Sequence, residues 1–219
     1  MQGEFDFGLN FPSRPKKPER LFFGLLADPE TAIGLDDFRQ WFLDENGLTG
    51  SLIKKERFHV SLHHIGDFKR LKSPLLYAAR MAGSAVSMHP FEMTFRFLKS
   101  LDGAPPKRGR PREWPLVLLG EGDDVRELYR TLGAALQRNG LRSAAHFVPH
   151  MTLLYGPKPI PMQAIQPIRV AVNEFVLIHS ELGLTRYNMI DRWRLKGSKG
   201  LVAAAVPRTM IAPERDAVP

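Results

Sequence analysis

Hydrophobic and polar residues change their spacing several times along the chain, and each change predicts the start of a new element. Residues 21–27 (LFFGLLA) form a short apolar run of the kind found in buried strands. Asp28 and Pro29 then supply a helix N-cap and a proline at the first helical position, and Asn46-Gly47 supplies a terminating signal. We therefore expect a buried strand followed by a helix that ends near residue 46.

The rest of the chain continues this succession of elements. Apolar runs or alternating residues predict further strands at residues 58–65, 91–97, 116–119, 150–155, 174–181 and 192–195. Helices are predicted from Ser73-Pro74 and from Asp123 and Asp124. Because the second half of this order loosely repeats the first, we expect an α+β fold with two pseudo-symmetric lobes. Each lobe would be a small, mainly antiparallel sheet with helices on its outer face, and the active-site cleft would lie between the lobes.

The composition along the chain predicts one folded unit with an extension at each end. Residues 1–19 are predicted to be a flexible basic arm, residues 20–206 a single bilobal domain, and residues 207–219 a frayed tail. The 219 residues are 43% hydrophobic and 25% charged, which excludes wholesale disorder. A chain of this length and composition is expected to bury a sizeable core as one globular unit.

Charge and missing residue types narrow the range of functions. No apolar run approaches the roughly 18 residues of a membrane span, and the first twenty residues lack the apolar core of a signal peptide. We therefore expect a cytoplasmic protein with no membrane contact. The absence of cysteine excludes disulfides, thiolate metal sites and cysteine nucleophiles. The net charge of +8 favours a polyanionic partner such as RNA, with solubility alone as the alternative.

Two short segments of the form His-x-Ser/Thr-Leu carry the candidate chemistry, one in each half of the chain. On a strand, residues i and i+2 share a face, so His59 and Ser61 project together, as do His150 and Thr152. If the lobes face each other, two imidazoles and two hydroxyls meet in the cleft. That set provides an acid, a base and two hydrogen-bond donors around one phosphate. One such motif is a weak pattern, but two at equivalent places favour function.

With these paired motifs the chain resembles the 2H phosphoesterase superfamily, and within it the bacterial 2′-5′ RNA ligase/RNA 2′,3′-cyclic phosphodiesterase branch. Residues 59–66 (HVSLHHIG) look like the family's His-x-Thr-Leu followed by an apolar residue and glycine. Residues 147–153 (FVPHMTL) are similar to its Phe-x-Pro-His-x-Thr-Leu, and the resemblance covers about residues 20 to 197. The chain departs from the family pattern at Ser61, where threonine is commoner, at His64, where a large apolar residue is usual, and at Tyr155, where arginine is frequent.

The resemblance implies metal-independent hydrolysis of the 2′,3′-cyclic phosphate ends of RNA to 2′-phosphates, with minor 2′-5′ RNA ligation. It implies that His150 is the base and His59 the acid, while Ser61 and Thr152 hold the non-bridging oxygens. No cofactor and no obligate protein partner is expected, and the partner is RNA or a nucleotide with a cyclic phosphate. A non-catalytic nucleotide- or RNA-binding module, and a phosphoesterase for a small cyclic nucleotide, remain as alternatives.

Further candidates for substrate binding lie outside the paired motifs. His63 is expected on the same strand face as Ser61, lining the cleft, and His64 on the packed face. Tyr187 is a candidate for stacking on a base, with a core or rim position as the alternative. A basic loop is a candidate for tracking an RNA backbone, with simple solvation as the alternative. Its candidate residues are Lys107, Arg108 and Arg110.

A metal site is not expected. His146 and His150 have the spacing of a helical zinc pair, but Pro149 between them argues against a helix there.

Overall fold

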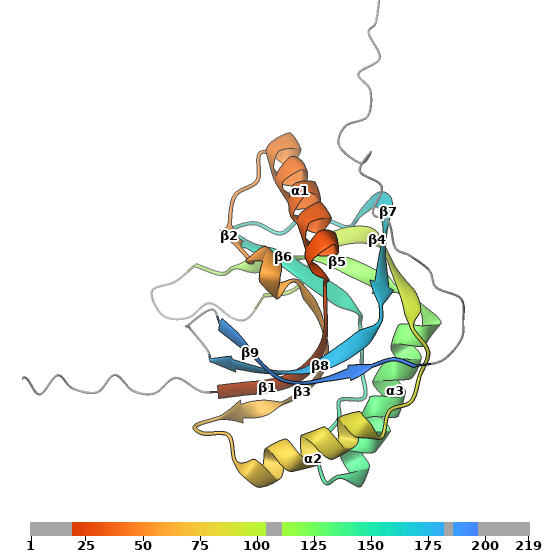
Figure 1. Cartoon of the computed structure of the whole chain (residues 1–219). Coiled ribbons are helices and arrows are strands. Elements are labelled where there is room, and N and C mark those ends of the chain that lie inside the picture. Colours follow the sequence, from red (N-terminus) through yellow and green to blue (C-terminus); the bar gives the residue numbers. More distant parts are fainter. Residues whose placement is uncertain (1–18, 104–110, 182–185, 197–219) are drawn as a thin grey trace, which may run out of the picture.

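The structure, a computed structural model, describes residues 19–103, 111–181 and 186–196. This part of the chain forms a nine-stranded sheet with three α-helices and one short 3₁₀ helix (Figure 1). The helices are α1 (Pro29–Asn46), α2 (Ser73–Ser84), α3 (Asp123–Arg138) and the 3₁₀ helix η1 (Lys55–Arg57). The strands are β1 (Glu19–Leu26), β2 (Ser51–Leu52), β3 (His59–Phe68), β4 (Phe91–Ser100), β5 (Trp114–Glu121), β6 (His150–Gly156), β7 (Gln163–Val172), β8 (Glu174–Glu181) and β9 (Arg186–Arg194).

The sheet has a weakly paired seam in its middle, between β3 and β6. Its strand order is β7-β4-β5-β6-β3-β1-β8-β9, with β2 paired to β6, and the pairings are antiparallel. Most neighbouring strands share six or more register pairs, whereas β3 and β6 share the single pair Val60↔Met151. The predicted α+β fold with a mainly antiparallel sheet is confirmed, and the seam is consistent with two lobes.

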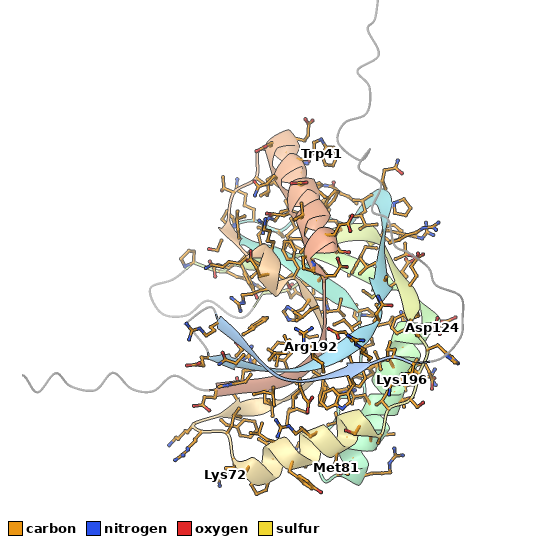
Figure 2. All side chains as sticks on the ribbon, in the orientation of Figure 1. Trp41, Lys72, Met81, Asp124, Arg192 and Lys196 are labelled. Carbon is orange, nitrogen blue, oxygen red and sulfur yellow. The ribbon has the colours of Figure 1, made fainter. Side chains whose placement is uncertain are left out.

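The helices cover the sheet from two sides. In Figure 1, α1 lies at one side of the strands and α2 and α3, which pack against each other, lie at the opposite side. Figure 2 labels Trp41 on α1 and Met81 on α2, with the strands between them. Arg39 of α1 donates a hydrogen bond to the Leu153 carbonyl of β6 at 3.2 Å, which fixes the helix against that strand. None of the described helices is long and apolar enough to cross a membrane.

The helix α1 begins and ends where the sequence predicts. The Asp28 carboxylate accepts hydrogen bonds from the backbone N–H groups of Glu30 and Thr31 at 3.1 and 3.0 Å. Gly47 closes the helix with φ of 58°, a left-handed conformation that glycine adopts without steric cost. In α3, by contrast, Asp123 and Asp124 lie in the first turn, and Gly122 occupies the N-cap position.

Three strands differ from the sequence prediction. The short β2 and the whole of β7 were not predicted, and only the end of β9 was. Pro167 interrupts the apolar pattern of β7, and a proline is tolerated there because β7 is an edge strand. The strands β8 and β9 return to pair beside β1, so one side of the seam combines strands from both ends of the described chain.

Candidate active site

A cavity of about 550 Å³ lies over the seam between β3 and β6. Both sides of the seam contribute to it, through side chains of β1, β3, β8 and β9 on one side and of β6 on the other. Its lining consists of Arg20, Phe22, Ile53, Arg57, His59, Ser61, His64, His150, Thr152, Tyr155, Ser180 and Tyr187.

The two motifs meet at the seam through their second residues. Val60 and Met151 are buried and form the single register pair between β3 and β6. Because the strands run antiparallel, His59 lies across the seam from Thr152, and Ser61 lies across from His150. The structure therefore brings all four predicted motif residues to one cavity.

Both histidines are held in the same way by a backbone carbonyl two residues earlier. His59 Nδ1 donates to the Arg57 carbonyl at 2.8 Å, and His150 Nδ1 donates to the Val148 carbonyl at 2.7 Å. A carbonyl only accepts, so the Nδ1 atoms carry the protons and each neutral ring keeps Nε2 as an acceptor. His59 Nε2 accepts from the Ser61 hydroxyl at 3.1 Å. The two rings thus present equivalent nitrogens for proton transfer.

The pKa of His59 is lowered to about 4, chiefly because burial disfavours the imidazolium. The hydrogen bond to the Arg57 carbonyl opposes this shift, while the positive charges of Arg57 and of a protonated His150 add to it. With this pKa, His59 is neutral at pH 7.

Aromatic rings form the wall beside His59. The ring centroids of Phe22 and Tyr187 lie 5.3 and 5.5 Å from that of His59. The guanidinium of Arg57 lies 4.2 Å from the centroid of the Tyr187 ring. Tyr187 therefore lines the cavity, and Arg57 lies over its ring.

A hydrogen-bonded ion cluster includes two further lining residues, Arg20 and His64. Arg20 donates to both carboxylate oxygens of Asp67, at 2.8 and 2.9 Å, and His64 Nε2 lies 3.0 Å from Asp67 Oδ1. The hydrogen bonds from Arg20 hold the pKa of the Asp67 carboxyl well below its usual range. The charge of Arg20 is thus balanced within the protein.

The expectation that His63 lines the cleft is wrong, and His64 takes that place. The pairs Phe22↔His64 and Gly24↔Ser61 match two steps on β1 with three steps on β3, which is a β-bulge. The extra residue reverses the alternation, so Leu62 and His63 both point into the core and His64 points outward. A bulge cannot be read from a single alternating pattern.

His63 instead joins β3 to α3. It is 1% exposed, its Nε2 donates to the Tyr129 carbonyl at 2.9 Å, and its ring stacks on Tyr129 with centroids 4.0 Å apart. Tyr129 stacks in turn on Phe147, three residues before His150, at 4.1 Å. Burial lowers the pKa of His63, which favours a neutral, structural imidazole.

The remaining candidates fall in different places. Lys107, Arg108 and Arg110 lie outside the described residues. Within residues 19–103, 111–181 and 186–196, no group of three His, Asp or Glu side chains is arranged to hold a metal ion. The sequence prediction missed Arg57 as a cavity residue, because its relation to Tyr187 depends on the pairing of β9 with β8.

Comparisons with known proteins give the fold class. No family model and no curated protein matches the chain. Among solved structures, E. coli LigT in its apo form is 22% identical with a TM-score of 0.60, over 83% of this chain and 99% of LigT. TT0787 of Thermus thermophilus is 18% identical with a TM-score of 0.63, over 81% of this chain and 98% of that one. A structure described as a phosphoesterase is 21% identical with a TM-score of 0.59, over 83% and 100% of the two chains.

These similarities establish that the chain has a LigT-like α+β fold along most of its length. The fold implied by the paired His-x-Ser/Thr-Leu motifs is thereby confirmed.

Proposed function

We propose that the protein is a 2H phosphoesterase that hydrolyses the 2′,3′-cyclic phosphate ends of RNA to 2′-phosphates without a metal ion. The observation that carries this proposal is the pair of equivalently held imidazoles, His59 and His150, facing one cavity across the seam. The hydroxyls of Ser61 and Thr152 line the same cavity as hydrogen-bond donors. Two imidazoles supply the base and the acid of a phosphodiester hydrolysis.

The proposed reaction is one in-line displacement at phosphorus. His150 Nε2 takes a proton from water while the water oxygen forms the new bond to phosphorus. The bond from phosphorus to the 3′ oxygen breaks, and protonated His59 delivers its proton to that oxygen. Ser61 and Thr152 donate hydrogen bonds to the non-bridging oxygens as negative charge builds on them. If a 5′-hydroxyl replaces water as the nucleophile, the same steps join RNA through a 2′-5′ linkage.

The acid role requires His59 to gain a proton together with the substrate. Burial keeps His59 neutral, but a phosphate anion beside the ring favours the imidazolium and raises its pKa. The cavity volume of about 550 Å³ suits a nucleotide-sized ligand. E. coli LigT has been crystallised with 3′-AMP and with phosphate, which supports a nucleotide phosphate as the ligand of this fold.

The test is hydrolysis of a short RNA with a 2′,3′-cyclic end, in excess chelator and without ATP, with chromatography to identify the product. We expect a 2′-phosphate, and a loss of turnover of roughly 10²–10⁴-fold in either His59→Ala or His150→Ala. The matched control is His89→Ala, which removes an exposed histidine outside the cavity. Near-full activity in either cavity variant, or activity that only a divalent metal restores, would contradict the proposal.

The alternatives give different results in the same assay. A nucleotide-binding module would bind 3′-AMP but turn over no cyclic phosphate. An enzyme for small substrates would hydrolyse a mononucleoside 2′,3′-cyclic phosphate with a higher kcat/KM than the RNA.

A further inference from the structure

Two arginines reach the cavity, and their environments differ. Arg20 is neutralised by two hydrogen bonds to the Asp67 carboxylate. Arg57 forms no ion pair and donates no side-chain hydrogen bond within the described part of the chain, and its Nε is buried without a partner. An unsatisfied buried donor on a charged group is costly. Arg57 therefore lines the cavity with a positive charge that no carboxylate of the described residues balances.

The position of this guanidinium is fixed from two directions. Its charged end lies 4.2 Å from the centroid of the Tyr187 ring, within the range of a cation–π contact. Its backbone lies at the end of η1, where the Arg57 N–H donates to the Lys54 carbonyl at 2.8 Å and the Arg57 carbonyl accepts from His59 Nδ1 at 2.8 Å. One residue thus holds the His59 ring in place and directs a cation into the cavity that this ring faces.

The chemistry of the group indicates what it would bind. A guanidinium is planar, stays charged at every accessible pH, and has a fork of N–H donors that matches phosphate oxygens. The contact with the Tyr187 ring uses no N–H group, and within the described residues the Arg57 guanidinium donates no hydrogen bond. The same positive charge contributes to the lowered pKa of His59, so an anion bound beside both groups would relieve this repulsion.

We propose that Arg57, held by the ring of Tyr187, is a phosphate-binding residue that takes a non-bridging oxygen of the substrate phosphate beside His59. The proposal deepens the proposed function and rests on it for the identity of the substrate, but the site itself is an anion site that does not depend on turnover. Tyr187 acts on the anion through Arg57, so in this proposal it is a positioning residue.

The first experiment measures binding of inorganic phosphate by calorimetry and by the shifts of the His59 resonances in NMR. We expect Arg57→Gln to weaken binding by roughly 10- to 100-fold, the range for loss of a charge-assisted hydrogen bond. Arg57→Lys should retain part of the affinity, because it keeps the charge but loses the planar fork. The matched control is Arg130→Gln on α3, which removes one exposed charge outside the cavity and should leave the affinity unchanged. Wild-type affinity for phosphate in Arg57→Gln would overturn the proposal.

The role of Tyr187 is tested by keeping or removing its ring. Tyr187→Phe retains the cation–π contact and should bind phosphate as the wild type does, whereas Tyr187→Leu should weaken binding in the same direction as Arg57→Gln. Equal affinity in Tyr187→Leu and Tyr187→Phe would refute the positioning role.

Activity on the cyclic-ended RNA separates the two proposals. If the wild type hydrolyses no cyclic phosphate but Arg57→Gln still loses phosphate affinity, the proposed function fails and the anion site stands. If the wild type is active and Arg57→Gln keeps both its turnover and its phosphate affinity, the anion site fails and the proposed function stands.

Discussion

Removing the imidazole of His59 should change how the stability of the protein depends on pH. The folded protein holds the pKa of His59 at about 4, against an ordinary value of 6.5 in an unfolded chain. Well above pH 6.5 the imidazole is neutral in both states, and the shift of its pKa has no effect on stability. As the pH falls from 6.5 towards 4, the unfolded chain gains a proton that the folded protein does not, so the folded state loses stability.

The size of this loss follows from the two pKa values. At pH 5 the shift of His59 costs the folded state about 2 kcal/mol relative to pH 7, and the loss approaches about 3 kcal/mol below pH 4. The variant His59→Gln has no titrating group at this position and escapes that part of the loss. The wild type should therefore become less stable relative to His59→Gln as the pH is lowered.

Urea unfolding of both proteins at pH 7, 6 and 5 measures this difference. Other shifted groups, such as the buried His63 and the paired Asp67, titrate alike in the two proteins and cancel in the comparison. A free-energy difference that stays constant between pH 7 and pH 5 would show that His59 titrates near 6.5. That result would refute the desolvated cavity and, with it, the need for a proton to enter with the substrate.

Binding of inorganic phosphate at pH 7 should draw more protons into the wild type than into His59→Gln, because an anion beside His59 favours the imidazolium. Calorimetry in buffers of different ionisation enthalpy measures the uptake of both proteins, and equal uptake would argue against His59 as the acid. The double variant of His59 and His150 to alanine should lose little more turnover than the slower single variant, since the two residues act as a unit. Turnover losses that multiply would instead show independent roles. Given the net charge of +8, binding of RNA oligonucleotides should weaken steeply as the salt concentration rises, and binding of a mononucleotide only slightly. Equal salt dependence of the two affinities would indicate that the basic residues 107–112 do not contact RNA.

Local signals predicted the elements that carry the site. The strands that begin at His59 and His150, and the capped helix α1, depend on residues close together in the sequence. The same logic failed beyond Ser61, because a bulge in β3 depends on how that strand pairs with β1. As a result, His63 lies on the packed face of β3 and His64 on the cavity face, the reverse of the prediction.

Other misses have different physical causes. β7 carries Pro167, which weakens any strand prediction unless the strand is known to lie at an edge. β9 (RYNMIDRWR) is largely polar and lacks a clear alternation, so its pairing with β8 decides its conformation. Arg57 was missed for a related reason, because β9 brings Tyr187 to it.

The paired motifs connect the two sides of the sheet and also line the cavity. This double role explains why the histidine and the hydroxyl residue of each motif are two positions apart. Val60 and Met151 join the two sides of the sheet, while the residues on either side of each project into the cavity. A shift of the register by one residue in either strand would bury a histidine and expose Val60 or Met151. Two antiparallel copies of one motif pair through Val60 and Met151, and their imidazoles line the same cavity. An in-line displacement needs a proton acceptor on one side of phosphorus and a proton donor on the other, and two imidazoles related in this way meet that requirement in the proposed reaction.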